Sequence, residues 1–258
     1  MQEKYIELFH VKHDHRIGEC IVFKKRIQEA FLDLNIHLTD QQAESLYIYY
    51  EMLVEWNKVM NLTGITEFED VLLKHFVDSA AIGNVMDMSK VHTVMDVGTG
   101  AGFPGMPLKI VFPHLKITLL DSLNKRIQFL NAVIEKLQLT ETETIHGRAE
   151  DFGRDVKYRE QYDLCVSRAV ANLSSLSEYC VPFIKVGGQF VSYKAGEVEE
   201  EVIAAEKAVR TLHCEPAKIA KTTLPNSDLT RAFVMIKKKG HLDKKYPRKA
   251  GMPTKNPL

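Results

Sequence analysis

The residues best suited to chemistry lie in one glycine-rich stretch, DVGTGAGFPG at positions 96–105. A short β-branched run at 91–97 precedes it, so the pattern predicts a strand that leads into a tight turn and then a helix. Glycines there let a ligand approach the backbone, and free amides at the start of a helix attract an anion. Asp121 ends the next predicted strand, where its carboxylate can accept the hydroxyls of a ribose. The loop and the acid together predict a site for an adenosine-type cofactor.

Charge and spacing favour S-adenosylmethionine over a dinucleotide. Asp96, directly before the loop, repels a pyrophosphate but attracts an ammonium group, which S-adenosylmethionine carries beside its carboxylate. The spacing Gly98-x-Gly100-x-Gly102 differs from the dinucleotide pattern G-x-G-x-x-G, although Gly105 leaves some ambiguity. A nicotinamide-dependent oxidoreductase is therefore kept as an alternative. The stretch resembles class I methyltransferases, whose motif ends a strand with an acid and continues G-x-G-x-G.

Two later segments bear on the acceptor. In class I methyltransferases, the position held here by RAE at 148–150 flanks the adenine, with an acid near its amino group, although Glu150 can equally be a surface carboxylate. After the fourth strand, many members that methylate amines carry N/D-P-P-Y, whereas this sequence has SRAV at 167–170. This difference argues against methylation of an exocyclic amine.

The elements that must position these residues alternate along the second half of the chain. Strands are expected at 91–97, 116–121, 162–167 and 189–193, and helices at 124–137 and 173–184. The alternation predicts an α/β fold with a mostly parallel, seven-stranded, Rossmann-like sheet, as in class I methyltransferases. The late strand 231–237, with no helix after it, is expected to enter antiparallel.

The first half of the chain is expected to form a helical cap on this sheet. Thr39 and Gln42 form a capping box, apolar residues recur at helical spacing as far as position 57, and a further helix is expected over 68–85. Four segments follow: a loose N-terminal extension at 1–23, the helical region at 24–88, the methyltransferase domain at 89–240 and a basic tail at 241–258. The extension contains His10, His13 and His15, but no Cys or acid completes a ligand set, so we expect no metal site.

Composition limits the class of protein. The 258 residues are 45% apolar, which suits one substantial globular domain, or one domain with a smaller appendage. Basic and acidic residues balance at 34 each, so attraction to nucleic acid must be local. Residues 1–8 lack the apolar core of a signal peptide, and no apolar run is long enough to span a membrane. The four scattered cysteines, expected to be reduced thiols in a cytoplasmic protein, are Cys20, Cys165, Cys180 and Cys214.

Eight short motifs occur together along positions 27–258. They are WN at 56–57, NLT at 61–63, KHFxDS at 74–79, DVGTGAGFPGMP at 96–107, LDSLNKR at 120–126, RAE at 148–150, SRA at 167–169 and YPRK at 246–249. In combination they resemble the RsmG (GidB) family, which methylates N7 of a guanine in bacterial small-subunit ribosomal RNA. The resemblance implies S-adenosylmethionine as cofactor, and it places in the cofactor site Gly98, Phe103, Ala149, Glu150 and Arg168.

The chemistry of N7 sets what the site must do. N7 of guanine holds a free lone pair, so no proton has to leave and no catalytic base is expected. Alignment of the reactants and tolerance of positive charge should suffice. Arg168 lies where the acceptor enters and is the candidate for positioning it, through a phosphate or guanine O6. An ordinary salt bridge at the end of a strand is the other interpretation of Arg168.

The chain end supplies the local charge for RNA. Positions 237–258 hold eight basic residues and one acid, a net charge of +7. Prolines should keep this tail extended, Tyr246 offers a stacking surface, and the residues expected to bind RNA are Lys244, Lys245, Arg248 and Lys249. The expected partner is ribosomal RNA or a small-subunit assembly particle, and the protein is expected to be a monomer. A solvated tail, a methyltransferase of this fold acting on another RNA, a small molecule or a protein, and an RNA-binding module with a relic pocket are the alternatives.

Overall fold

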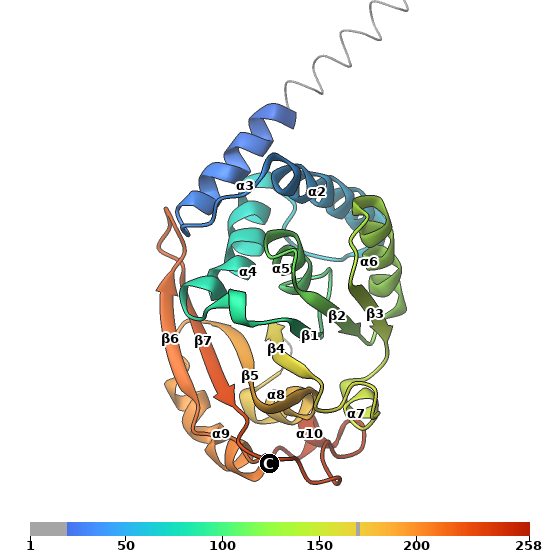
Figure 1. The fold of residues 1–258 in the computed structure, drawn as a ribbon, viewed down its shortest axis with the longest axis vertical. Helices are drawn as coiled ribbons and strands as arrows, with labels where there is room; N and C mark the ends of the chain where they lie inside the picture. The colour runs from blue at the N-terminus through green and yellow to red at the C-terminus, as the bar shows by residue number, and fades with distance from the viewer. Residues whose placement is uncertain (1–19, 169–170) are drawn as a thin grey trace, which may run out of the picture.

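The computed structural model describes residues 20–168 and 171–258, and a central sheet lies between two layers of helices (Figure 1). Its seven strands run in the order β3-β2-β1-β4-β5-β7-β6. The strands are β1 (Thr93–Val97), β2 (Lys116–Asp121), β3 (Thr142–His146), β4 (Tyr162–Arg168), β5 (Ile184–Ala195), β6 (Lys218–Thr223) and β7 (Thr230–Lys237). Of these seven, β7 runs opposite to the rest, since it pairs antiparallel with both β5 and β6. The mostly parallel, seven-stranded sheet and its antiparallel late strand are therefore confirmed.

Helices cover both faces of the sheet. After a helix over residues 20–32, the chain forms α2 (Asp40–Met60), α3 (Phe68–Val71), the π-helix η1 (Leu72–Val77), α4 (Asp78–Ala80), the 3-10 turns η2 (Ala81–Asn84) and η3 (Met88–Lys90), α5 (Gly105–Val111) and α6 (Asn124–Leu137). The later helices are α7 (Ala149–Phe152), α8 (Leu173–Cys180), η4 (Val181–Phe183), α9 (Glu199–Thr211) and α10 (Met252–Lys255). The single helix expected over 68–85 is thus a series of segments with a π-helical turn inside it. The short α10 also corrects the expectation that no helix follows the last strand.

Two apolar cores hold the layers together. Side chains alternate along each strand, so Val94 enters the core beneath α2–α6 whereas Met95 enters the core beneath α7–α9. Leu119 and Leu120 divide in the same way on β2. The sheet is therefore buried on both faces, which explains why the middle residues of its inner strands are mainly apolar.

The helical cap packs directly onto the glycine loop. Tyr49 of α2 is fully buried, and its hydroxyl donates a hydrogen bond to the carbonyl of Ala101. Thr39 and Gln42 form the capping box predicted from the sequence. The Gln42 side chain also donates to the carbonyl of Ile110 at 2.9 Å, which ties the start of α2 to α5. The cap and the sheet therefore share one core.

The chain ends differ from the expected boundaries. Cys20 already belongs to a helix, so residues 20–23 are not part of a loose extension, and His10, His13 and His15 lie outside the described residues. Within 20–168 and 171–258, no helix is both long and apolar enough to cross a membrane. The four cysteines are free thiols, and three of them are buried.

Candidate functional site

Two adjoining cavities lie at the carboxyl edge of the sheet. The first, of about 390 Å³, is lined by residues that include Thr63, His75, Gly98, Gly100, Phe103, Asp121 and Arg168. The second, of about 260 Å³, is lined by residues that include Gly98, Ala149, Glu150 and Tyr179. Gly98 and Ser122 line both cavities, so the two meet beside the loop. The position between β1 and β4, where the strand order reverses, is where α/β sheets bind ligands.

The glycine loop after β1 leaves room above its backbone. Gly98, Gly100 and Gly102 have φ angles of 72°, 64° and 102°, a region that favours glycine. A Cβ on Gly102 would lie 2.6 Å from the hydroxyl of Tyr49, so this glycine permits the close approach of α2. The amide of Ala101 donates to no acceptor within the described ranges. Because Ala101 lines the first cavity, that amide is available to a ligand.

Asp96 lies behind the loop and lines neither cavity. Its side chain is fully buried, and its Oδ2 accepts hydrogen bonds from the hydroxyl of Thr99 at 2.7 Å and the amide of Gly105 at 2.8 Å. Its Oδ1 has no partner among the residues that the structure describes. Burial raises the pKa of Asp96 to about 7, although both hydrogen bonds and Arg168 oppose the shift. Asp96 therefore braces the loop from behind through Oδ2, and its attraction for a ligand ammonium stays a prediction.

Asp121 reaches the first cavity with its carboxylate already engaged. Its two oxygens accept the amides of Gly100 and Leu123, each at 2.9 Å. The guanidinium of Arg126 lies 3.1 Å from Oδ2. Accepting ribose hydroxyls therefore requires Arg126 to move aside. Arg126 belongs to the motif LDSLNKR, but nothing in the sequence indicated this contact.

Glu150 is a buried wall of the second cavity. It is 7% exposed and lies in the first turn of α7, directly after Ala149. Its Oε1 accepts the amide of Gly251 at 2.8 Å. The alternative that Glu150 is a surface carboxylate is therefore wrong. Gly251 is 101 positions away in the chain, and no local pattern indicated the contact.

Arg168 ends β4 and closes the first cavity at its other side. Its Nη1 donates to Asp78 at 2.8 Å and to the carbonyl of Lys74 at 3.2 Å. Its Nη2 lies 3.2 Å from Nδ1 of His75, and its guanidinium carbon lies 5.2 Å from the ring centre of Phe103. Arg168 thus forms the ion pair that the sequence analysis kept as an alternative, and it lines the cavity as well.

The partner of Arg168 is shared with a second arginine. Asp78 is 2% exposed, and its Oδ1 accepts from Nε of Arg231 on β7 at 2.7 Å. One buried carboxylate therefore holds two guanidinium groups, which leaves a net positive charge beside the cavity. Neither Asp78 nor Arg231 was predicted as a site residue, because the two are 153 positions apart in the chain.

His75, in the π-helical turn η1 of the cap, lines the first cavity beside Arg168. Its ring stacks on Phe103 with centres 4.3 Å apart, and its Nε2 lies 3.0 Å from the hydroxyl of Thr63. Burial and the charge of Arg168 lower the pKa of His75 to about 4, so the ring is neutral at pH 7. Its Nδ1 lies between a donor, Nη2 of Arg168, and an acceptor, the carbonyl of Lys74 at 3.1 Å. His75 and Asp78 are three positions apart, about one helical turn, and this spacing could have indicated that both side chains lie on one face of the helix.

The basic tail is docked, which corrects the expectation of an extended tail. Tyr246 is 7% exposed and belongs to the second core, so it offers no stacking surface. Arg248 pairs with Glu178, whose side chain is fully buried, and is therefore engaged within the protein. The expected RNA-binding residues that remain exposed are Lys244, Lys245 and Lys249.

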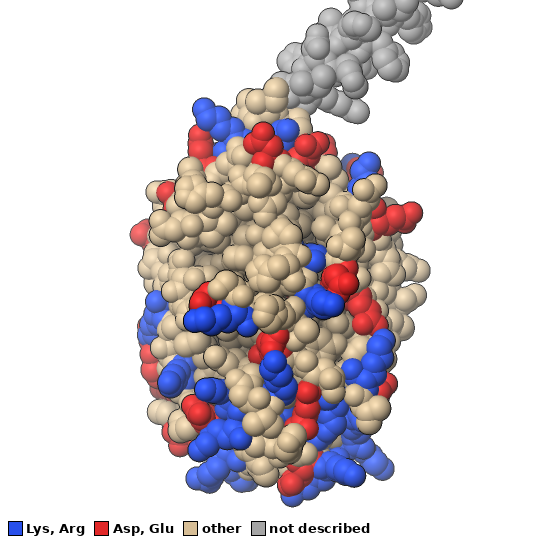
Figure 2. Space-filling model, viewed as in Figure 1, with Lys and Arg blue, Asp and Glu red and all other residues tan. Residues whose placement is uncertain are grey.

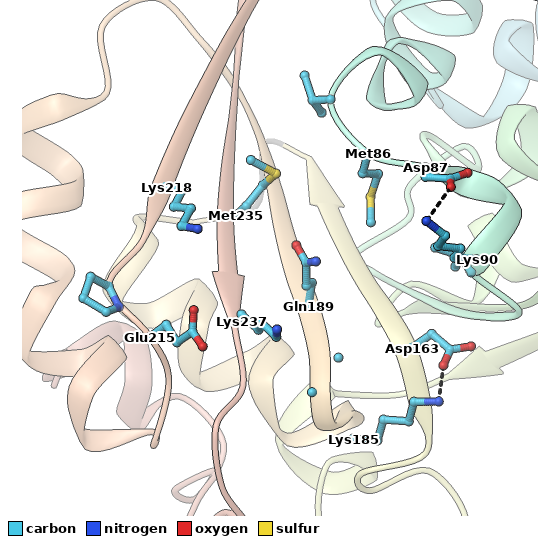
Figure 3. Close-up of a pocket in the computed structure, with 15 residues that line it drawn as sticks. Met86, Asp87, Lys90, Asp163, Lys185, Gln189, Glu215, Lys218, Met235 and Lys237 are labelled. Atoms are coloured by element: carbon cyan, nitrogen blue, oxygen red, sulfur yellow. Dashed lines mark ion pairs between the residues drawn. The ribbon is translucent and has the colours of Figure 1, made fainter.

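A larger hollow, of about 560 Å³, lies at the opposite edge of the sheet (Figure 3). Two of its lysines are neutralised, since Lys90 pairs with Asp87 and Lys185 pairs with Asp163. It lies at the amino ends of β4 and β5, away from the glycine loop. Although this hollow is larger, ligands of such sheets bind at the carboxyl ends of the strands, so we do not assign it to the cofactor. Across the described part of the chain, no three His, Cys, Asp or Glu side chains are arranged to hold a metal ion.

Known proteins resemble this chain in sequence or in fold. The sequence profile of the GidB family, described as rRNA small subunit methyltransferase G, matches residues 42–230. The chain is 46% identical over 235 residues to ribosomal RNA small subunit methyltransferase G of Alkaliphilus metalliredigens, which covers 91% of this chain and 98% of that protein. The protein of that name from Lysinibacillus sphaericus is 50% identical over 230 residues, covering 89% and 97%. A crystal structure of a mutant of MtNAS, at 11% identity, superposes with a TM-score of 0.50 over 77% of this chain and 76% of that one, a likeness of fold alone.

Proposed function

Because this chain belongs to the rRNA small subunit methyltransferase G (GidB) family, we propose that it transfers a methyl group from S-adenosylmethionine to N7 of a guanine in 16S ribosomal RNA. The observation that carries this proposal is the pair of cavities beside the glycine loop, with Glu150 at one end and Arg168 at the other. The partner is ribosomal RNA, free or within a small-subunit assembly particle.

The residues of the two cavities fit S-adenosylmethionine. The unpaired amide of Ala101 suits the carboxylate of its amino-acid part. Asp96, behind the loop, stabilises the ammonium through its charge, and Glu150 accepts from the adenine amino group. Asp121 accepts the ribose hydroxyls after Arg126 moves. Backbone and apolar walls come from Gly98, Gly100, Phe103 and Ala149.

Transfer to N7 requires alignment and no proton acceptor. Bound S-adenosylmethionine supplies a methyl carbon made electrophilic by a positively charged sulfur. N7 offers its free lone pair, so no side chain has to remove a proton first. His75 is suited to a supporting role, since both ring nitrogens already face Arg168 and Thr63. The protein contributes by holding the two reactants in line.

Arg168 is the residue that orients the guanine. Nη1 donates to Asp78 and to the carbonyl of Lys74, and Nη2 lies 3.2 Å from Nδ1 of His75. In the described ranges, its Nε hydrogen and second Nη2 hydrogen have no acceptor. These two donors suit guanine O6, whereas adenine presents an amino donor at that position. Arg168 therefore favours guanine while leaving N7 free to react.

A basic rim beside the site attracts the RNA. Lys244, Lys245 and Lys249 are exposed, and Figure 2 shows Lys and Arg side chains gathered along the lower end of this face, over α9 and α10. The whole chain has no net charge, so the attraction is local. The deep, narrow major groove of A-form RNA hides N7, so the target guanine lies in a loop, an irregular region or partly assembled RNA.

Labelled methyl transfer tests the reaction directly. The protein is incubated with radiolabelled S-adenosylmethionine and ribosomal RNA, and the RNA is digested to nucleosides. We expect the label in 7-methylguanosine. Another labelled nucleoside would overturn the acceptor atom, and label in small molecules or protein but not in RNA would favour the alternative acceptors.

Arg168→Ala tests the orienting role. Affinity for the cofactor and affinity for RNA are measured separately, with Arg168→Lys retaining the charge but not the planar fork of donors. We expect loss of transfer in both variants, because a lysine cannot engage Asp78, His75 and a guanine at once. Unchanged affinities and an unchanged rate would reject the role.

Charge removal tests the basic rim. Replacing Lys244, Lys245 and Lys249 by glutamine should weaken RNA binding and reduce the slope of log affinity against log salt by about 2. A matched control replaces three exposed lysines elsewhere, namely Lys25, Lys90 and Lys116. Equal losses in the two triple variants would show that the rim has no special role.

The cytoplasm is the compartment where such an enzyme meets ribosomal RNA, and the thiols of the chain suit a reducing environment. A monomer suffices, because both cavities are lined by one chain. Light scattering on the purified protein tests this, and a stable dimer would contradict it.

A further inference from the structure

The last turns of the chain pack against α8 and reach the second cavity. We call residues 246–255 the terminal strap. The hydroxyl of Ser175 donates to the carbonyl of Pro253 at 2.8 Å, and the hydroxyls of Tyr179 and Thr254 lie 2.6 Å apart. Gly251 and Thr254 line the cavity together with Glu150. The strap therefore forms a wall of the site and not a free arm.

A buried ion pair anchors the strap. Glu178 on α8 is fully buried, and its carboxylate accepts the backbone amide of Arg248 at 2.7 Å and two guanidinium nitrogens, Nε at 2.9 Å and Nη2 at 2.6 Å. Arg159 adds a hydrogen bond to the carbonyl of Tyr246 at 2.7 Å. A buried carboxylate without its cation is strongly unfavourable, so Glu178 fixes where the strap lies.

The anchored strap in turn fixes Glu150. The amide of Gly251 occupies Oε1 of Glu150, and no residue in the described ranges binds Oε2. The hydrogen bond to Oε1 restricts rotation of the Glu150 carboxylate and so restricts the direction in which Oε2 points. Since Glu150 lines the cavity, its free oxygen is an acceptor oriented before any ligand arrives.

We infer that the terminal strap is a specificity element for the cofactor: by holding Glu150 through Gly251, it makes the second cavity select an adenine ring over rings that lack the exocyclic amino group. This inference rests on the proposed function, because it assigns the second cavity to adenine. It also separates two roles in one segment. The docked backbone serves the cofactor, whereas the exposed lysines beside it serve RNA.

Calorimetry with S-adenosylhomocysteine as probe tests the anchor. Glu178→Gln removes the charge that holds Arg248 but leaves every basic residue of the tail. We expect this variant to bind the probe at least about tenfold more weakly, while its RNA affinity stays within about twofold. The glutamine triple variant at Lys244, Lys245 and Lys249 should show the reverse pattern. Glu197→Gln, at an exposed ion pair, is the matched control and should change neither affinity.

A second probe tests selectivity for the ring. In S-inosylhomocysteine an oxygen replaces the adenine amino group and faces the Glu150 carboxylate, so the unaltered protein should bind it at least about tenfold more weakly than the adenosyl compound. Glu178→Gln should lose most of that preference. A folded Glu178→Gln protein that keeps both its affinity and its preference would overturn the inference.

Hydrogen exchange on the unaltered protein decides the matter even if Glu178→Gln does not fold. Saturating S-adenosylhomocysteine should slow exchange of the Gly251 amide and its neighbours in the strap. Slowed exchange at the glycine loop without any change in the strap would overturn the inference alone. Absence of binding to the unaltered protein would instead overturn the proposed function.

Discussion

Asp96→Asn separates what the buried carboxylate does for the fold from what it does for the cofactor. An asparagine keeps one oxygen to accept from Thr99 and Gly105, and it places its amide nitrogen where Oδ1 has no described partner. The pKa of Asp96 rises from 3.8 to about 7. Because one pKa unit corresponds to about 1.4 kcal/mol, ionising Asp96 in the folded protein costs about 4 kcal/mol.

The sign of the effect follows from proton binding. Between about pH 4 and pH 7 the folded protein holds the Asp96 proton while the unfolded chain has released it. The contribution of Asp96 to stability therefore falls as the pH rises through this range and is constant above it. Asparagine has no such dependence. Relative to the parent, the variant should gain about 2 to 3 kcal/mol in free energy of unfolding between pH 5 and pH 8.

Urea unfolding of both proteins without cofactor, at pH 5 and pH 8, measures this gain. Asp163→Asn is the control of opposite sign: burial alone would raise the pKa of Asp163, but Lys185 and backbone amides lower it to about 2. This control should lose stability about equally at both pH values. If Asp96→Asn were less stable than the parent at pH 8, or if its difference from the parent did not vary with pH, the account of Asp96 would be refuted.

The remaining predictions concern the loop, His75 and the cofactor. Gly102→Ala should lower the free energy of unfolding by about 3 kcal/mol, because its Cβ meets Tyr49, whereas Gly100→Ala, in open space, should lose about 1 kcal/mol; similar losses in urea would contradict this. At saturating cofactor the methyl-transfer rate should show no titration of His75 between pH 6 and pH 8, and His75→Asn, which keeps an acceptor for Arg168, should retain more activity than His75→Phe. Affinity for S-adenosylhomocysteine should rise from pH 6 to pH 8 with release of a proton, as Asp96 ionises beside the ammonium; calorimetry in two buffers measures this, and Asp96→Asn should abolish it.

Sequence patterns located the parts of the fold that local chemistry determines. Strands β1, β2, β4 and β7 are mainly apolar runs bounded by turns, so they could be predicted. The glycine loop indicated where the first cavity lies. The edge strands β3 and β6 were not located, because both are largely polar and partly exposed. A strand that buries little apolar surface leaves little periodic signal.

The contacts that complete the site are between residues distant in the chain. Glu150 with Gly251, and Asp78 with Arg231, are 101 and 153 positions apart, so spacing along the chain carries no trace of either contact. Composition also gave a partly wrong account of the tail. Arg248 was expected to be free to bind RNA, whereas it pairs with the buried carboxylate of Glu178.

The shared carboxylate of Asp78 has an evolutionary consequence. Losing Asp78 would leave two guanidinium groups close together without a counter-charge, whereas losing either arginine would leave the other pair intact. The order of substitution is therefore constrained: Arg231 can drift before Asp78, but Asp78 cannot drift first. Among related proteins, Arg231 should therefore be replaced before Asp78, or the three residues Asp78, Arg168 and Arg231 should be replaced together. These three residues form one epistatic group that joins the cap, β4 and β7.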